Sequence, residues 1–185
     1  MPDFRIGLLN TWTLLAAYAA GFLLALVPYS RQERSWLFED LKYRLRGWRR
    51  LLLFLGQVVA VTFITATVFA PLRFEAPTFL AGIVLYGVGY ATVIGALYYF
   101  RRASKTGPVT TGPYHFSRNP QWVGLFLVLL GTAFASGAWL MSMAVVGVAA
   151  VYHLQILAEE ELCRNKYGEA YQRYCRDVPR YLLVF

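Results

Sequence analysis

Long apolar runs without a formal charge constrain this chain more than any other feature of its sequence. Three such runs are about 20 residues long and contain no Lys, Arg, Asp or Glu; they cover residues 8–27, 51–70 and 77–100. A helix needs about 20 apolar residues to cross the hydrocarbon core of a bilayer, and it satisfies its own backbone hydrogen bonds there. Each run therefore predicts a transmembrane helix.

A fourth apolar region, residues 120–158, contains 39 residues without a formal charge. One straight helix of that length would reach about 58 Å, roughly twice the hydrocarbon thickness. Two shorter helices with a tight turn near Ser136 and Gly137 fit the membrane better. With 58% hydrophobic and 15% charged residues, the chain is predicted to be an all-α integral membrane protein. We expect about five transmembrane helices, the last two forming a short helical hairpin.

The polar segment between the first two runs predicts a helix that lies in the membrane interface. Ser30 and Glu33 have the spacing of a capping box, in which each side chain bonds the other residue's backbone N–H. Bases occupy the opposite face, which is typical of an amphipathic anchoring helix. The apolar face would consist of Leu37, Leu41, Leu45 and Trp48.

The basic residues predict an orientation. All but two of the 18 Lys and Arg residues lie in residues 29–50, 101–118 and 162–180, whereas Arg5 and Arg73 fall on the other side of the predicted membrane. For a protein of an inner or plasma membrane, the positive-inside rule then places the N-terminus outside and the C-terminus in the cytoplasm. The net charge of +8 reflects this topology, so we expect no nucleic-acid partner.

The tail after the last apolar run contains no proline before Pro179, so the fifth helix is expected to continue past the membrane as a cytoplasmic extension. On one continuous helix Cys163 and Cys175 would stand about 18 Å apart along the axis. They cannot form a disulfide in that geometry, and we expect two free thiols in a reducing compartment.

The segment GPYHFSRNPQWVG, residues 112–124, joins a turn to the fourth apolar region. Asn119 and Pro120 suit the N-cap and the first position of a helix. Capping does not explain Arg118, which lies at the expected membrane edge. An arginine beside a helix N-terminus forms an anion site.

Three carboxylates, Glu159 to Glu161, lie where the fifth helix is expected to leave the membrane. Carboxylates at that depth need a cationic partner. Arg101 and Arg102 are candidates, and a cationic ligand is another. His153 falls on the helical face of Glu160, and both a site role and a packing role remain open for it. A hairpin would bring the anion site and the acidic cluster to the same membrane face, where a zwitterionic ligand with a sulfonium would suit both.

Two motifs then resemble a known superfamily. The pattern G-x-Y-x-x-x-R-N-P-x-W-x-G, followed by E-E, K-Y-G-x-x-Y-x-x-Y and V-P-R over residues 106–181, resembles the isoprenylcysteine carboxyl methyltransferases and phospholipid methyltransferases. The resemblance implies S-adenosylmethionine as cofactor, no metal, and a lipid or lipidated acceptor from the bilayer. It also implies two cofactor motifs, the first with Gly112, Tyr114, Arg118, Asn119, Pro120 and Gly124, and the second with Glu159 and Glu160.

We therefore expect a single membrane domain over residues 1–185, with three spans and the interfacial helix in 1–100 and the cofactor-binding, catalytic region in 101–185. Arg118 would bind the cofactor carboxylate or an anionic head group. If the acceptor is an amine, Glu160 or His153 would be its base. Many family members have His in place of Asn119 and Tyr in place of Trp122, so a histidine role at 119 does not transfer.

Two other functions stay open. The tail also resembles the end of the NADPH-dependent membrane sterol reductases, which are usually much longer chains with more spans. A membrane scaffold without activity is the other alternative, in which the glutamates only balance the bases.

Overall fold

A computed structural model describes residues 7–38, 48–104 and 106–182. Within these residues the regular structure is helical, with seven α-helices, one 3₁₀-helix and no strand, which confirms the all-α prediction. Only an isolated bridge between Asn10 and Pro71 has β geometry there. The helices are α1 (Trp12–Leu26), α2 (Arg31–Leu37), α3 (Trp48–Phe69), α4 (Phe79–Arg102), η2 (Gly112–His115), α5 (Pro120–Ser136), α6 (Trp139–Tyr167) and α7 (Glu169–Asp177).

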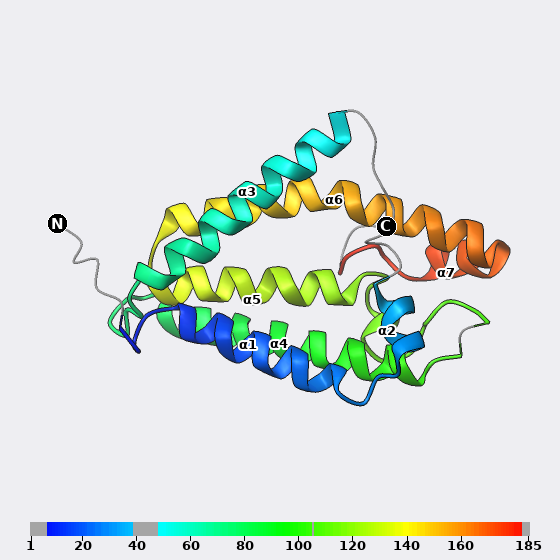
Figure 1. Cartoon of the computed structure of the whole chain (residues 1–185), viewed down its shortest axis with the longest axis horizontal. Coiled ribbons are helices and arrows are strands. Elements are labelled where there is room, and N and C mark those ends of the chain that lie inside the picture. Colours follow the sequence, from blue (N-terminus) through cyan, green and yellow to red (C-terminus); the bar gives the residue numbers. More distant parts are fainter. Residues whose placement is uncertain (1–6, 39–47, 105, 183–185) are drawn as a thin grey trace.

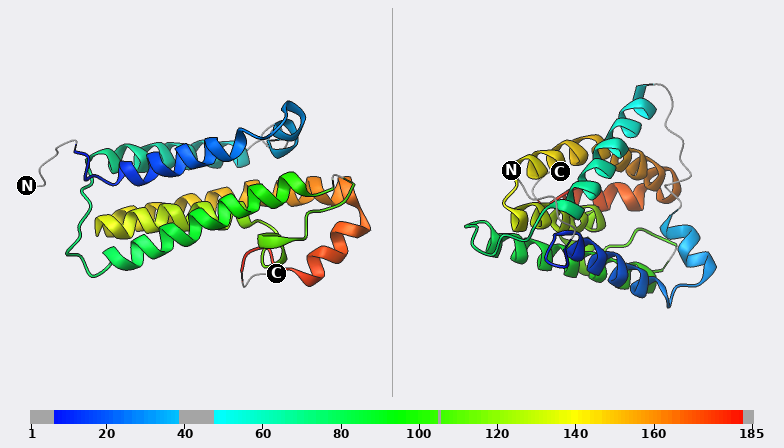
Figure 2. Two further views of the ribbon diagram at one scale, coloured as in Figure 1. Left: turned by 90° about the horizontal axis from the view of Figure 1, so that it is seen from below. Right: turned by 60° about the vertical axis from the view of Figure 1, so that its left-hand side comes forward.

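The five longest helices run lengthwise through the molecule (Figure 1). Helix α5 lies between α4 and α6, while α1 packs on α4 and α3 packs on α6 (Figures 1 and 2). The short helices α2 and α7 gather at one end of this bundle, together with the connection between α4 and α5. The opposite end holds the turns that join α3 to α4 and α5 to α6.

Among the described residues, three helices are long and apolar enough to cross a membrane: Arg50–Phe69, Phe79–Arg102 and Trp139–Tyr167. Helices α1 and α5 are apolar but have only 15 and 17 residues, or about 22 and 26 Å. The five predicted apolar helices are therefore all present in the predicted order. That all five cross the bilayer stays a prediction.

The turn that was predicted near Ser136 is confirmed. Helix α5 ends at Ser136, Gly137 adopts a left-handed conformation with φ of 65°, and α6 begins at Trp139. Glycine suits this position because it has no Cβ to clash there. The Thr78 hydroxyl donates to the Phe134 carbonyl at 2.9 Å, so the turn is tied to the start of α4.

Two pairs of glycines fix the register of α4 and α5. A Cβ on Gly82 would lie 2.7 Å from the Gly131 carbonyl oxygen, and a Cβ on Gly89 would lie 2.6 Å from the Gly124 carbonyl oxygen. The two backbones therefore approach more closely than any larger residue allows, as in small-residue packing of membrane helices. This contact sets the end of α4 beside the start of α5, where the site described below lies.

The capping box of the interfacial segment is confirmed, because both the Ser30 and the Glu33 bonds are present at the start of α2. Helix α2 itself ends at Leu37. The predicted helix continued through Leu41 and Leu45, and this part, residues 39–47, lies outside the described residues.

The fifth apolar helix continues past the glutamates as predicted, but the prediction that the same helix reaches Cys175 was wrong. Helix α6 ends at Tyr167, Gly168 adopts φ of 54° and ψ of −127°, and α7 folds back from there. The sequence contains no proline at this point, and the glycine alone makes the break. As a result Cys163 on α6 and Cys175 on α7 pack against the same cluster, formed by Tyr171, Tyr174 and Val178. Both thiols are free.

Candidate active site

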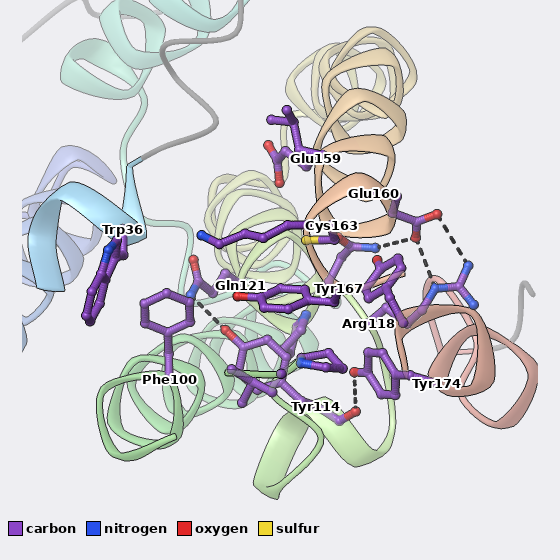
Figure 3. Close-up of a pocket in the computed structure, with 18 of the residues that line it drawn as sticks. Trp36, Phe100, Tyr114, Arg118, Gln121, Glu159, Glu160, Cys163, Tyr167 and Tyr174 are labelled. Atoms are coloured by element: carbon purple, nitrogen blue, oxygen red, sulfur yellow. Dashed lines mark hydrogen bonds and ion pairs between the residues drawn. The ribbon is translucent and has the colours of Figure 1, made fainter. Parts of the chain in front are cut away.

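A cavity of about 650 Å³ opens at the end of the bundle where α2 and α7 gather (Figure 3). Its wall combines residues from α2, the end of α4, the connection to α5, the first turn of α5, the last turns of α6, and α7. The volume lies in the range of small-molecule sites. The two sequence motifs, about 40 residues apart, therefore meet at one cavity.

A buried ion pair forms one side of this cavity. Arg118 Nε lies 3.1 Å from Glu160 Oε1, and both side chains are only 2% exposed. Asn119 Nδ2 donates to the same oxygen at 3.1 Å. Arg180 donates to Oε2 through Nε at 3.1 Å and Nη2 at 3.0 Å, and these hydrogen bonds raise the pKa of the Arg180 guanidinium. Glu160 is thus the acceptor for three protein side chains.

Arg118 also ties the C-terminal tail to the bundle. Its Nη1 donates to the carbonyls of Cys175 at 3.0 Å and Val178 at 2.6 Å, and its backbone N–H donates to the Pro179 carbonyl at 2.9 Å. Beside it, the Ser117 hydroxyl donates to the Arg180 carbonyl at 2.9 Å. The Arg118 guanidinium is therefore engaged largely by protein groups, and its main observed role is to position the tail.

Arg118 and Arg180 neutralise Glu160, rather than Arg101 or Arg102, which were one of the alternatives left open for the glutamate cluster. Arg101 lies 3.8 Å from Glu33 on α2, and the Arg102 guanidinium lies 4.6 Å from the centre of the Tyr98 ring. The reason is geometric: α4 ends on the α2 side of the cavity, whereas Glu160 faces the tail on the other side.

Asn119 occupies the N-cap position of α5 as predicted, with Pro120 at the first helical position. Its side chain does not cap the helix, however; within the described part of the chain it makes no capping hydrogen bond. The amide Nδ2 instead donates to Glu160 and, at 3.2 Å, to the Arg180 carbonyl. The capping explanation of this asparagine was therefore wrong, because its side chain hydrogen-bonds the buried Glu160 carboxylate instead of a backbone N–H of α5.

Glu159 lines the cavity on the side of α5, separate from the arginine cluster. Its Oε2 accepts a hydrogen bond of 2.9 Å from Trp122 Nε1. The Trp122 ring in turn lies 5.2 Å from the ring of Tyr152, between centroids. This arrangement places a carboxylate beside an aromatic wall, which is the environment that favours a cation.

Three tyrosine hydroxyls at the cavity are kept in the neutral, protonated form. Burial raises the pKa of each of Tyr114, Tyr171 and Tyr174 above its usual value. The Tyr114 hydroxyl accepts a hydrogen bond of 2.9 Å from Gln121, and the Tyr174 hydroxyl donates to the Tyr114 carbonyl at 2.6 Å (Figure 3). These bonds fix η2 against α5 and α7.

Six of the predicted site residues line the cavity, namely Tyr114, Arg118, Asn119, Pro120, Glu159 and Glu160. Among the described residues Gly112, Gly124 and His153 are outside that lining. Gly112 has φ of 62°, and a Cβ there would lie 2.3 Å from the Tyr99 ring. Gly124 belongs to the α4–α5 contact, and His153 Nδ1 shares a hydrogen bond of 2.6 Å with the Tyr181 hydroxyl.

Sequence reasoning missed several residues of the cavity. Arg180 belongs to the quoted V-P-R motif, but its ion pair with Glu160 was not predicted. Trp36 and Phe100 line the cavity from α2 and α4, and no local pattern identifies them because they meet only in the folded chain.

A family model described as phospholipid methyltransferase matches residues 77–170. This range covers α4, η2, α5 and α6 and ends in the first residues of α7. Helices α1 to α3 lie before it. No curated protein matches the chain.

Proposed function

Because this chain belongs to the phospholipid methyltransferase family, we propose that it transfers a methyl group from S-adenosylmethionine to a lipid head group or a lipidated acceptor. The family and the three long apolar helices make it an integral membrane methyltransferase. The methyl donor and the acceptor class are part of this proposal. The observation that supports them best is the cavity that joins both sequence motifs at the end of the bundle.

The cavity suits S-adenosylmethionine in size and in chemistry. A volume of about 650 Å³ is ample for a nucleoside joined to an amino acid. Tyr167, Tyr171 and Trp122 offer aromatic faces, which suit an adenine ring and a sulfonium. Glu159 supplies a negative charge on the same wall, and Lys166 supplies a positive one at its rim.

When bound, S-adenosylmethionine would supply a methyl group that its sulfonium activates; the acceptor attacks the methyl carbon in line while the C–S bond breaks and S-adenosylhomocysteine leaves. The protein then contributes mainly position and electrostatics. We assign Glu159 to the sulfonium of the cofactor. Glu160, Arg118 and Asn119 are positioning residues, since they hold the tail and the start of α5 against each other. For an amine acceptor, Glu159 is better placed as a base than His153, which binds Tyr181 outside the cavity lining.

The orientation is also proposed. The cavity lies at the end of the bundle that carries the basic segments, with Arg101, Arg164, Lys166 and Arg180 around it. The positive-inside rule places this end in the cytoplasm. Soluble cofactor would then enter from the cytoplasm and the acceptor from the bilayer. The division into an N-terminal span region and a C-terminal catalytic region stays a prediction.

Binding calorimetry on detergent-purified protein tests the proposal. We expect S-adenosylmethionine and S-adenosylhomocysteine to bind, and NADPH to give no heat. The variant Glu159→Gln keeps an acceptor for Trp122 but removes the charge. It should weaken the binding of S-adenosylmethionine by about tenfold or more, the scale of a charged hydrogen bond, and spare S-adenosylhomocysteine, whose sulfur carries no charge. Equal losses for both ligands would contradict the role of Glu159, and NADPH binding alone would contradict the methyltransferase proposal.

A further inference from the structure

Helix α2 supplies part of the cavity wall although the family match begins at residue 77. Trp36 and Leu37, both from α2, line the cavity together with Phe100 from the end of α4. This wall is therefore contributed partly by a segment of the chain that the family model does not cover.

Several interactions hold α2 in this place. Glu33 closes the capping box with the Ser30 backbone N–H at 2.7 Å, and it lies 3.8 Å from Arg101 at the end of α4. Arg34 Nη2 donates to the Leu26 carbonyl at 3.0 Å. Leu37 packs on the buried cluster that joins α1 and α4. The position of Trp36 is thus fixed by the bundle.

The two ends of the cavity differ in chemistry. In Figure 3, Trp36 and Phe100 lie on one side, and Arg118 and Glu160 lie on the opposite side, with Tyr167 between them. The arginine end is closed by the C-terminal tail, because Arg118 donates to two of its carbonyls. A hydrocarbon chain cannot leave through that polar end without separating these bonds. Within the described wall, the lining side chains of α2 and α4 are apolar, and Trp36 and Phe100 lie next to each other at the aromatic end (Figure 3).

We propose that Trp36 and Phe100 form the acceptor-binding wall of the cavity and that Trp36 selects acceptors by packing on the hydrocarbon next to the reacting head group. The inference rests on the proposed methyltransferase function. Tryptophan suits this place because its ring packs on apolar groups at the level where head groups meet the bilayer. The cofactor motifs occupy the α5 and α6 walls, so the two ligands would meet between Tyr114 and Glu159.

The test compares Trp36→Ala and Trp36→Phe with Trp139→Ala, in which an exposed tryptophan at the opposite end of the bundle is removed. Binding of S-adenosylmethionine is measured by calorimetry. Methyl transfer is measured in mixed micelles with phosphatidylethanolamine that has dihexanoyl or dioleoyl chains, and with S-geranylcysteine or S-farnesylcysteine as the second acceptor pair.

We expect Trp36→Ala to raise the KM of the longer-chain acceptor about tenfold, the effect of truncating a buried aromatic anchor, and to raise that of the shorter-chain acceptor less. The values of kcat and S-adenosylmethionine affinity should stay within about twofold of wild type. Trp36→Phe should recover most of the loss, and Trp139→Ala should match wild type.

An unchanged KM in Trp36→Ala, or an equal rise for both chain lengths, would overturn the inference. If Trp36→Ala no longer binds S-adenosylmethionine, the same comparison is made with Trp36→Leu, which keeps apolar volume. Failure of the wild-type protein to bind S-adenosylmethionine would instead refute the proposed function, so the two failures are distinguished.

Discussion

The variant Glu160→Gln tests whether the Glu160 carboxylate stabilises the fold or binds the cofactor. Glu160 accepts hydrogen bonds from Arg118, Asn119 and Arg180, and its side chain is 2% exposed. Glutamine keeps the shape but removes the charge, so a buried guanidinium loses its counter-ion. Breaking one partner of a buried pair costs about 3–5 kcal/mol of unfolding free energy. For a chain of this length, each kcal/mol lowers the midpoint of thermal unfolding by roughly 2–4 °C, so this midpoint should fall by about 10 °C.

Thermal unfolding in detergent, followed by tryptophan fluorescence with and without S-adenosylmethionine, measures this loss. The control is Arg164→Gln, since Arg164 lies 3.8 Å from Glu160 and is itself 50% exposed; solvent screens its charge, so removing it should cost at most about 1 kcal/mol. We expect Glu160→Gln to lower the apo midpoint and to keep a ligand-induced shift. An unchanged apo midpoint together with a lost shift would refute the positioning role and assign Glu160 to the cofactor.

Two contacts and the distribution of the basic residues each give one further prediction. Asn119→Asp should lower the thermal midpoint in the same assay, because a second carboxylate would replace the amide 3.1 Å from Glu160; a midpoint equal to wild type would restore the capping explanation. Gly89→Ala should lower the free energy of unfolding by about 1–3 kcal/mol, because its Cβ would lie 2.6 Å from the Gly124 carbonyl oxygen. In the control Gly87→Ala a Cβ meets nothing within 4 Å, so stability should be unchanged or higher. Equal effects of the two substitutions would contradict the close helix contact. A C-terminal fluorescent fusion should be bright in the cytoplasm, and a dark fusion with periplasmic reporter activity would reverse the proposed orientation.

Local patterns were sufficient for the helices and for some of their ends. Charge-free runs predicted the five apolar helices, Ser30 and Glu33 predicted the start of α2, and Gly137 marked the hairpin turn. Each of these depends on residues within a few positions of one another. Gly168 was a similar local signal that α6 ends there, but the absence of a proline favoured the prediction of one continuous helix.

Pairings between distant residues could not be predicted in the same way. The motifs indicated that Arg118 and Glu160 belong to one site, but their mutual pairing depends on the return of the tail at residues 178–180. Trp36 reaches the cavity only because α2 folds onto the end of α4. The seven-residue spacing of Gly82 and Gly89 in one helix, and of Gly124 and Gly131 in the other, was the unused signal for the α4–α5 contact.

Transfer of a labelled methyl group tests the central claim most directly. Purified protein in lipid micelles is incubated with S-adenosylmethionine that is labelled in its methyl group, and label is counted in the organic extract against S-adenosylhomocysteine formed. The proposed function predicts one lipid-soluble label for each S-adenosylhomocysteine, with loss of both in Glu159→Gln at low cofactor concentration. The proposed function would be contradicted if wild-type protein that is folded and binds S-adenosylmethionine gave no more label in the lipid phase than protein-free micelles do.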